Sequence, residues 1–219
     1  MRNISSEDLS GKYGEYVSPE LVRRSMRMFQ PYKAPGPDGF KPVVFKHLPG
    51  VFFERLAFLY KACLHFQYTP RIWRETLVVF IPKPGKSSYR EASSFRPICL
   101  SNYLIKGLEC LICWRMQGHL HYYPIPPRQH GFQKGKSTET ASSNCTDRAE
   151  WYVFRGQKAV GIFLDISSAY NSVGIHHIRN SLCLHGGDDD LVEWYFHYLG
   201  HRVLDIRLHD GQVRLQNAV

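Results

Sequence analysis

Two short apolar runs constrain this fold more than any other feature of the sequence. Residues 76–81 (TLVVFI) are β-branched and apolar, and the run ends at Pro82. Residues 160–166 (VGIFLDI) form the second run. Runs of this length and composition are typical of buried strands. Helical spacing dominates the rest of the sequence, so we expect a helix-rich α/β (α+β) chain with a short sheet.

The helices are predicted from spacing and end signals. Ser18 is a suitable N-cap, Pro19 suits the first helical position, and apolar residues then recur with helical spacing. Asp190 and Glu193 have the spacing of a capping box. Further helices are expected at 51–66, 104–120, from 137 into the 140s, at 175–184 and at 190–199.

The remaining segments are predicted from turn chemistry and charge. Residues 1–17 are polar and contain glycine, so we expect a loose lead-in. Residues 82–102 carry several basic side chains and are expected to form a long functional loop. Residues 202–215 alternate around Asp210-Gly211, which predicts a hairpin.

The net charge indicates which class of binding partner to expect. The chain has 28 Lys and Arg against 19 Asp and Glu, a formal charge of +9, which favours a polyanionic partner; the alternative is that the charge serves solubility alone. No apolar run reaches the length of a membrane span, and we expect no membrane partner. The six cysteines follow no disulfide framework and the first residues lack a secretory signal, so we expect an intracellular, reduced protein.

Two motifs invite a chemical interpretation that their spacing does not support. The segment 130–140 (HGFQKGKSTET) is one residue too short between its glycines for a phosphate-binding P-loop. It still predicts a basic turn before a helix N-terminus, where Lys134 and Lys136 could meet nucleic-acid phosphates; an ordinary capped helix with solvated lysines is the alternative. Cys110 and Cys113 lie within an apolar helical pattern, which favours core cysteines over a zinc site.

Asp165 is the strongest candidate for a functional residue. It lies at the C-terminal end of a predicted strand, where burying a carboxylate is costly unless a cation or hydrogen-bond donors meet it. One interpretation is a turn that closes the strand. The other is an oxygen ligand for Mg²⁺, which favours carboxylates together with substrate phosphates.

Five stretches, in order, resemble one family. They are YKAPGPDGF (32–40), WRETLVVFIPKPGKSSY (73–89), SFRPICLSNYLIKGLE (94–109), QHGFQKGKSTETA (129–141) and FLDISSAYNSV (163–173). Together they resemble the reverse transcriptases of non-LTR, LINE-type retrotransposons, most of all the Jockey-type group. The resemblance implies an RNA-directed DNA polymerase with a right-hand fold. Its partners would be an RNA template, a DNA primer and dNTPs, and its cofactor Mg²⁺, with Mn²⁺ as a possible substitute.

The resemblance also implies roles for individual residues. Asp165 would be the first catalytic aspartate and would hold the metal with the backbone carbonyl of Ile166. Tyr170 would exclude a ribose 2′-OH by its bulk. The remaining nucleotide-binding positions would be Lys83 and Arg96, which meet the triphosphate, and Ser168 and Ala169.

The same resemblance implies the domain organisation. Residues 18–158 would form the fingers and the fingers–palm region, and 159–219 a partial palm that stops before the paired aspartates of the family. We therefore expect the isolated chain to be inactive, and a nuclear location if the family mechanism applies. Cys99, Asn102 and Cys110 replace expected residue types, which is consistent with a decaying copy. The alternatives are a non-catalytic nucleic-acid-binding remnant and a chain that does not fold stably.

Overall fold

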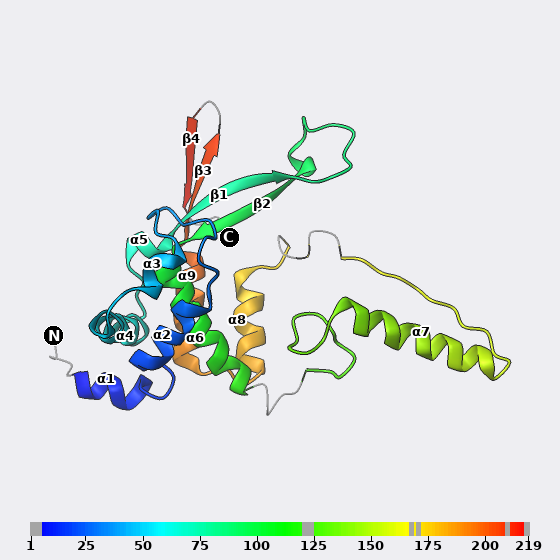
Figure 1. Ribbon diagram of the computed structural model, residues 1–219, viewed down its shortest axis with the longest axis horizontal. Helices are drawn as coiled ribbons and strands as arrows, with labels where there is room; N and C mark the ends of the chain where they lie inside the picture. The colour runs from blue at the N-terminus through cyan, green and yellow to red at the C-terminus, as the bar shows by residue number, and fades with distance from the viewer. Residues whose placement is uncertain (1–5, 120–124, 167–168, 170–171, 209–210, 217–219) are drawn as a thin grey trace. The chain divides into compact units, whose positions relative to one another are not determined.

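The computed structural model describes residues 6–119, 125–166, 169, 172–208 and 211–216 (Figure 1). The chain divides into two compact units, which are described separately: unit 1 comprises 1–119 and 174–219, and unit 2 comprises 120–173. This division follows contacts and does not coincide with the predicted boundary between 158 and 159. The assignment of fingers and palm therefore stays a prediction.

Unit 1 contains eight described α-helices, one 3₁₀ helix and four strands. In chain order they are α1 (Ser6–Tyr13), α2 (Pro19–Met28), α3 (Pro42–Lys46), α4 (Gly50–His65), α5 (Arg71–Arg74), β1 (Glu75–Pro82), η1 (Ala92–Ser94), β2 (Phe95–Ser101), α6 (Tyr103–His119), α8 (Ile175–Leu184), α9 (Asp189–Gly200), β3 (Val203–Leu208) and β4 (Gly211–Gln216). Unit 2 contains α7 (Thr138–Phe154). The predicted helix-rich α/β class is confirmed.

Helices α2, α4 and α6 form the core of unit 1. The Ser18 hydroxyl accepts a hydrogen bond from the Leu21 N–H (3.3 Å), which fixes the start of α2 as the sequence predicted. Gly107 lets α6 approach its neighbours, because a Cβ there would lie 2.6 Å from Met26 Sδ and 2.7 Å from the Tyr60 hydroxyl oxygen. The fully buried aromatic side chains of this core are Tyr13, Phe53, Tyr60, Trp194 and Tyr198.

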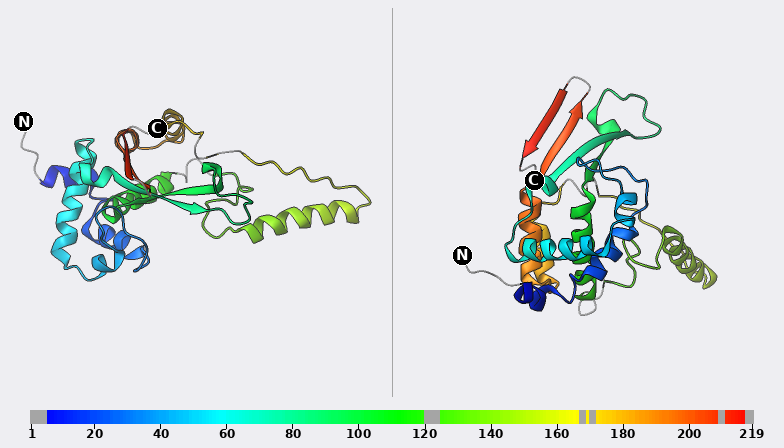
Figure 2. Two further views of the ribbon diagram at one scale, coloured as in Figure 1. Left: turned by 90° about the horizontal axis from the view of Figure 1, so that it is seen from above. Right: turned by 60° about the vertical axis from the view of Figure 1, so that its left-hand side comes forward.

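The sheet of unit 1 has four strands in the order β2-β1-β3-β4. β1 pairs antiparallel with β2 from Thr76–Ser101 to Pro82–Phe95, and parallel with β3 over its first four residues. β3 and β4 form the predicted hairpin, and its Asp210 lies outside the described residues. Thr76 and Val78 are buried, whereas the outer half of the β1–β2 hairpin extends away from the helices (Figures 1 and 2).

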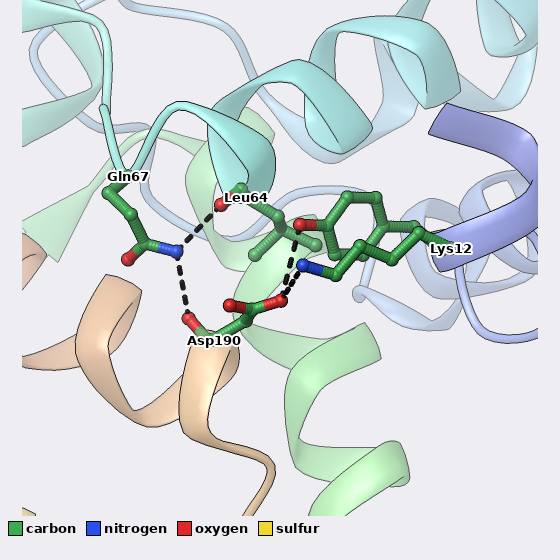
Figure 3. Close-up of polar contacts among 5 residues, drawn as sticks. Lys12, Leu64, Gln67 and Asp190 are labelled. Atoms are coloured by element: carbon green, nitrogen blue, oxygen red, sulfur yellow. Dashed lines mark hydrogen bonds and ion pairs between the residues drawn. The ribbon is translucent and has the colours of Figure 1, made fainter. Parts of the chain in front are cut away.

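The expectation of a loose lead-in is wrong for the described residues of the segment. Residues 6–13 form α1, and Leu9 and Tyr13 are buried in the core of unit 1. Lys12 forms an ion pair with Asp190 of α9, and the Tyr13 hydroxyl donates to the same carboxylate at 3.5 Å (Figure 3). Gln67 Nε2 donates to the Asp190 carbonyl at 3.1 Å. Long-range contacts thus hold α1 in place.

These contacts also correct the predicted capping box of α9. The helix begins one residue earlier than expected, its N-cap is Asp188, and no side chain caps it. Asp190 is bound to Lys12 instead, and Glu193 pairs with Arg179 of α8. Both carboxylates form ion pairs with cations from other helices. The spacing of Asp190 and Glu193 therefore predicted where the helix begins to within one residue, but not the partners of these two side chains.

The second predicted strand is absent from unit 2. Residues 158–166 have no regular secondary structure, and Ile162, Phe163 and Leu164 are 81–90% exposed. A strand needs a neighbour to pair its backbone N–H and C=O groups, and the described part of unit 2 offers none. The helix of this unit, α7, also has no buried residue in its described length.

Candidate active site

Asp165 lies in an open position. It follows the exposed segment 158–164 of unit 2, and its carboxylate accepts a hydrogen bond from the N–H of Ile166 at 2.9 Å. Both residues are exposed, Ile166 by 77%. Ala169 is half-buried in a turn, whereas Ser168 and Tyr170 lie outside the described residues. The carboxylate is therefore accessible and is not buried at the end of a strand.

The donor set around Asp165 suits part of a magnesium site. Mg²⁺ is usually bound by one or two carboxylates together with substrate phosphates and water. Asp165 supplies one carboxylate and Ile166 one carbonyl. No group of three or more His, Cys, Asp or Glu side chains that could hold a metal occurs among the described residues. These residues fit a single ion shared with a triphosphate, but not a complete two-metal site.

A groove lies along α7, beside the segment that leads to Asp165. Its volume is about 750 Å³, and the segment 157–161 forms one wall. Tyr152 and Phe163 supply apolar surface, while Arg148 and Lys158 supply positive charge. Sequence reasoning missed this groove because it expected residues 160–166 to be paired within a sheet.

Lys83 and Arg96 lie at the same end of the β1–β2 hairpin in unit 1. Arg96 pairs with Ile81, and the Lys83 N–H donates to the Ser94 carbonyl at 2.9 Å. Directly opposed residues share a face of an antiparallel pair, so this register places Lys83 and Arg96 diagonally on one face. The structure therefore brings the two predicted triphosphate ligands together on one element.

The connection after β1 is held by its own side chains. Lys83 Nζ donates to the Ser93 carbonyl at 2.9 Å, and the Tyr89 hydroxyl donates to the Lys83 carbonyl at 2.9 Å. The rings of Tyr89 and Phe95 lie 5.9 Å apart, edge to face. The prediction of one long loop over 82–102 is wrong for residues 95–101, which form β2. The loop that remains carries Lys86 and Arg90, both exposed.

The basic turn before α7 is folded onto the helix start. Ser137 and Thr140 form a capping box, in which the Thr140 N–H donates to Ser137 Oγ at 3.2 Å. Lys136 Nζ donates to the carbonyls of Pro127 and Gln129, the second at 2.9 Å. Lys134 is exposed. The two lysines therefore differ: Lys136 already has partners that shape the turn, and Lys134 projects into solvent.

Asn102 anchors the loop 34–39 (APGPDG), a structural role that the sequence did not reveal. It is 1% exposed, its Oδ1 accepts from the Asp38 N–H at 3.2 Å, and its Nδ2 donates to the Ile72 carbonyl at 2.7 Å. A Cβ at Gly36 would lie 2.4 Å from that Oδ1, so only glycine fits there. Both the carbonyl and the amide group of the Asn102 side chain therefore form a hydrogen bond.

Partial burial shifts the pKa values of three charged residues in this part of unit 1. Burial raises the pKa of Asp38 and lowers the pKa of Lys106, whose ammonium lies over the ring of Tyr103 at 4.6 Å. Burial also raises the pKa of Glu109, against the opposing influence of the Arg202 and Lys106 charges. Asp38, Lys106 and Glu109 are therefore partly desolvated charged groups of unit 1.

Most of the chain matches one known protein family. Residues 81–216 match the family described as "Reverse transcriptase (RNA-dependent DNA polymerase)", which is more than half of the chain. The chain belongs to this reverse transcriptase family. The matched range contains Lys83, Arg96 and Asp165, and it begins near the end of β1.

The relatives of this reverse transcriptase chain come from mobile elements. It is 31% identical over 153 residues to the "Retrovirus-related Pol polyprotein from type-1 retrotransposable element R1" of Bradysia coprophila, covering 70% of this chain and 15% of that protein. Two Drosophila melanogaster relatives are the "Probable RNA-directed DNA polymerase from transposon BS" (31% identical) and the "RNA-directed DNA polymerase from mobile element jockey" (29% identical). Each match covers 72% of this chain and 17% of the relative.

These matches confirm the resemblance to non-LTR retrotransposon reverse transcriptases. The chain spans only about one sixth of the length of these curated relatives. Among the described residues, no helix is long and apolar enough to cross a membrane.

Proposed function

We propose that this chain is part of an RNA-directed DNA polymerase that transfers nucleotides by a two-metal mechanism. One observation carries the proposal: the exposed carboxylate of Asp165 lies within the FLDISSAY segment (163–170), inside the range that matches the family. A bound Mg²⁺ would supply charge neutralisation for the triphosphate. Asp165 and the carbonyl of Ile166 are the residues that would hold it.

The other residues position the substrate. Lys83, one residue after β1, and Arg96 of β2 would bind triphosphate oxygens, and the Lys83 ammonium would exchange its bond to the Ser93 carbonyl for one to the substrate. Ser168, Ala169 and Tyr170 would contact the sugar side of the nucleotide. Lys134 would contact a nucleic-acid phosphate directly, whereas Lys136 would act by shaping the turn that presents it. The partners of this site would be an RNA template, a DNA primer and dNTPs, in the nucleus.

We also propose that the 219-residue chain alone does not polymerise. A two-metal site needs carboxylates from more than one palm element, and the resemblance assigns only Asp165 within these residues. Positioning and charge stabilisation supply most of phosphoryl transfer, so an incomplete carboxylate set removes most of the rate.

Primer extension tests both proposals. The purified chain is incubated with a primed RNA template, dNTPs and Mg²⁺ or Mn²⁺, beside an Asp165→Asn variant. We expect no extension from either. A longer polypeptide that continues through the paired aspartates should extend the primer, and Asp165→Asn in it should abolish extension. Template-dependent synthesis by the 219-residue chain would contradict its inactivity, and an active Asp165→Asn long form would contradict the role of Asp165.

A non-catalytic nucleic-acid-binding remnant is the second candidate. It is favoured by the net charge of +9 and by the exposed, unpaired segment that precedes Asp165. It predicts salt-dependent RNA binding that dNTPs do not change and that Asp165→Asn leaves intact. Loss of extension in the long form together with unchanged RNA binding would support this second function.

A further inference from the structure

Helix α2 presents three arginines to solvent. Arg23, Arg24 and Arg27 are all exposed and lie on the side of the helix opposite its buried residues. With Glu20 and Met28 they line a shallow groove of about 500 Å³. Arg23 and Arg27 are one helical turn apart, about 6 Å along the axis. The three guanidinium groups therefore form one positive surface, which we call the α2 arginine face.

Unlike four other basic residues of unit 1, these arginines have no carboxylate partner among the described residues, and all three lie on one helix face. Lys12, Arg71, Arg115 and Arg179 each form an ion pair. None of the described residues pairs with an arginine of the α2 arginine face, although Glu20 lies only one turn away. Concentrated positive charge without internal partners favours an external anion.

The neighbouring side chains orient one of the guanidinium groups. The guanidinium of Arg24 lies over the ring of Trp114 of α6, 5.3 Å from its centroid. Such stacking restricts the side chain and leaves its N–H groups free to donate. Arg24 is thereby held at the surface between α2 and α6.

We propose that the α2 arginine face binds the phosphate backbone of single-stranded RNA. Guanidinium groups match phosphate oxygens in charge and in paired hydrogen-bond geometry, and two arginines one turn apart can meet successive phosphates. α2 lies outside residues 81–216, so the family match does not assign this surface. The choice of RNA rests on the proposed function, in which RNA is the template.

An anionic membrane and an acidic protein fit the surface less well than RNA does. A helix that binds a membrane needs a broad apolar face beside its basic residues, and a protein interface needs an apolar centre. The exposed side of α2 offers only one large apolar side chain, Met28, which is 61% exposed. A flexible phosphate chain needs neither feature.

Fluorescence anisotropy with a labelled, unstructured RNA of about 20 nucleotides tests the proposal, because that length allows several phosphate contacts. Affinity is measured between about 50 and 200 mM KCl for the 219-residue chain and for Arg23→Ala/Arg27→Ala. We expect affinity to fall by roughly fivefold per arginine and the salt slope to fall by about 0.7 per contact. Arg23→Lys/Arg27→Lys should keep the slope and lose part of the affinity, since lysine keeps the charge but not the paired geometry.

Arg55→Ala is the matched control for Arg27→Ala. Arg55 is an exposed arginine of α4 in the same unit, and its loss changes the net charge equally. Equal weakening by Arg27→Ala and Arg55→Ala would overturn the proposal, because it would show a response to net charge alone. Unchanged RNA binding by the double variant would also overturn the proposal. The same holds if the double variant binds RNA normally and instead loses affinity only for phosphatidylserine vesicles or for an acidic peptide. Circular dichroism should show unchanged helicity and melting.

The result is independent of polymerase activity. If the long form fails to extend a primer but the α2 arginine face still binds RNA, the proposed function fails and this inference stands. If extension succeeds and the double variant binds RNA normally, the inference fails and the proposed function stands.

Discussion

Replacing Asn102 by alanine should destabilise unit 1 strongly. The side chain is 1% exposed and bridges segments that are far apart in sequence, by accepting from the Asp38 N–H at 3.2 Å and donating to the Ile72 carbonyl at 2.7 Å. Alanine would leave both backbone groups without a partner. The backbone of Gly36 packs against Asn102 Oδ1, which leaves little room for water to replace the lost groups.

The expected cost follows from these two bonds. A buried polar group left unsatisfied costs about 1–3 kcal/mol, so Asn102→Ala should lower the free energy of unfolding by about 2–5 kcal/mol. A domain has only about 5–15 kcal/mol in total, so this loss is easily measured. Urea unfolding followed by circular dichroism gives the value, provided that the slope with denaturant is unchanged.

Asn180→Ala is the matched control. Asn180 is exposed on α8 in the same unit, and its substitution should change the free energy of unfolding by less than about 0.5 kcal/mol. Equal effects of the two substitutions would refute the argument, because they would show that the two bonds of Asn102 contribute nothing measurable.

Three further substitutions test other parts of the fold by the same unfolding measurement. Gly107→Ala should destabilise by about 1–2 kcal/mol, because overpacking against Met26 and Tyr60 exceeds the gain in helix propensity, whereas Gly118→Ala, whose Cβ meets nothing, should be neutral or stabilising. Burial raises the pKa of Glu109 above 4.5, so its ionised form destabilises the fold at neutral pH; Glu109→Gln should be the more stable protein at pH 7, and its advantage should vanish as the pH falls below 4.5. A less stable Glu109→Gln at pH 7 would show that the cations near it outweigh burial. Val78→Ala in β1 should cost about 1.5–3 kcal/mol, whereas Ile162→Ala should stay within about 0.5 kcal/mol, and a large loss at 162 would mean that this segment is packed.

Local signals were enough to predict elements whose partners are near in sequence or whose ends are marked. Ser18 and Pro19 fixed the start of α2, and α8 spans Ile175–Leu184 as the spacing predicts. The β3–β4 hairpin was also predictable, because alternation on both sides of a turn is a local pattern. β1 was predictable since its run is apolar and β-branched up to Pro82.

Elements that depend on distant partners were missed. β2 contains Arg96 and Pro97 and is exposed over most of its length, so its sequence shows neither burial nor alternation. It is a strand because β1 pairs with it, and Pro97 is tolerated on this edge strand. α1 was missed for a related reason: Lys12 and Tyr13 hold it through Asp190, which lies far away in the sequence.

The candidate site shows the same division between local and distant information. The identity of Asp165 as a candidate came from its position after an apolar run, and that run was expected to be a buried strand. In the described structure the run is exposed and unpaired. Apolar composition indicates that a segment is suited to burial, but a strand forms only where a neighbouring strand can exchange backbone hydrogen bonds with it. The sequence was therefore enough to select Asp165 as a candidate. The exposure of its carboxylate could not be predicted, because it depends on residues outside the segment 160–166.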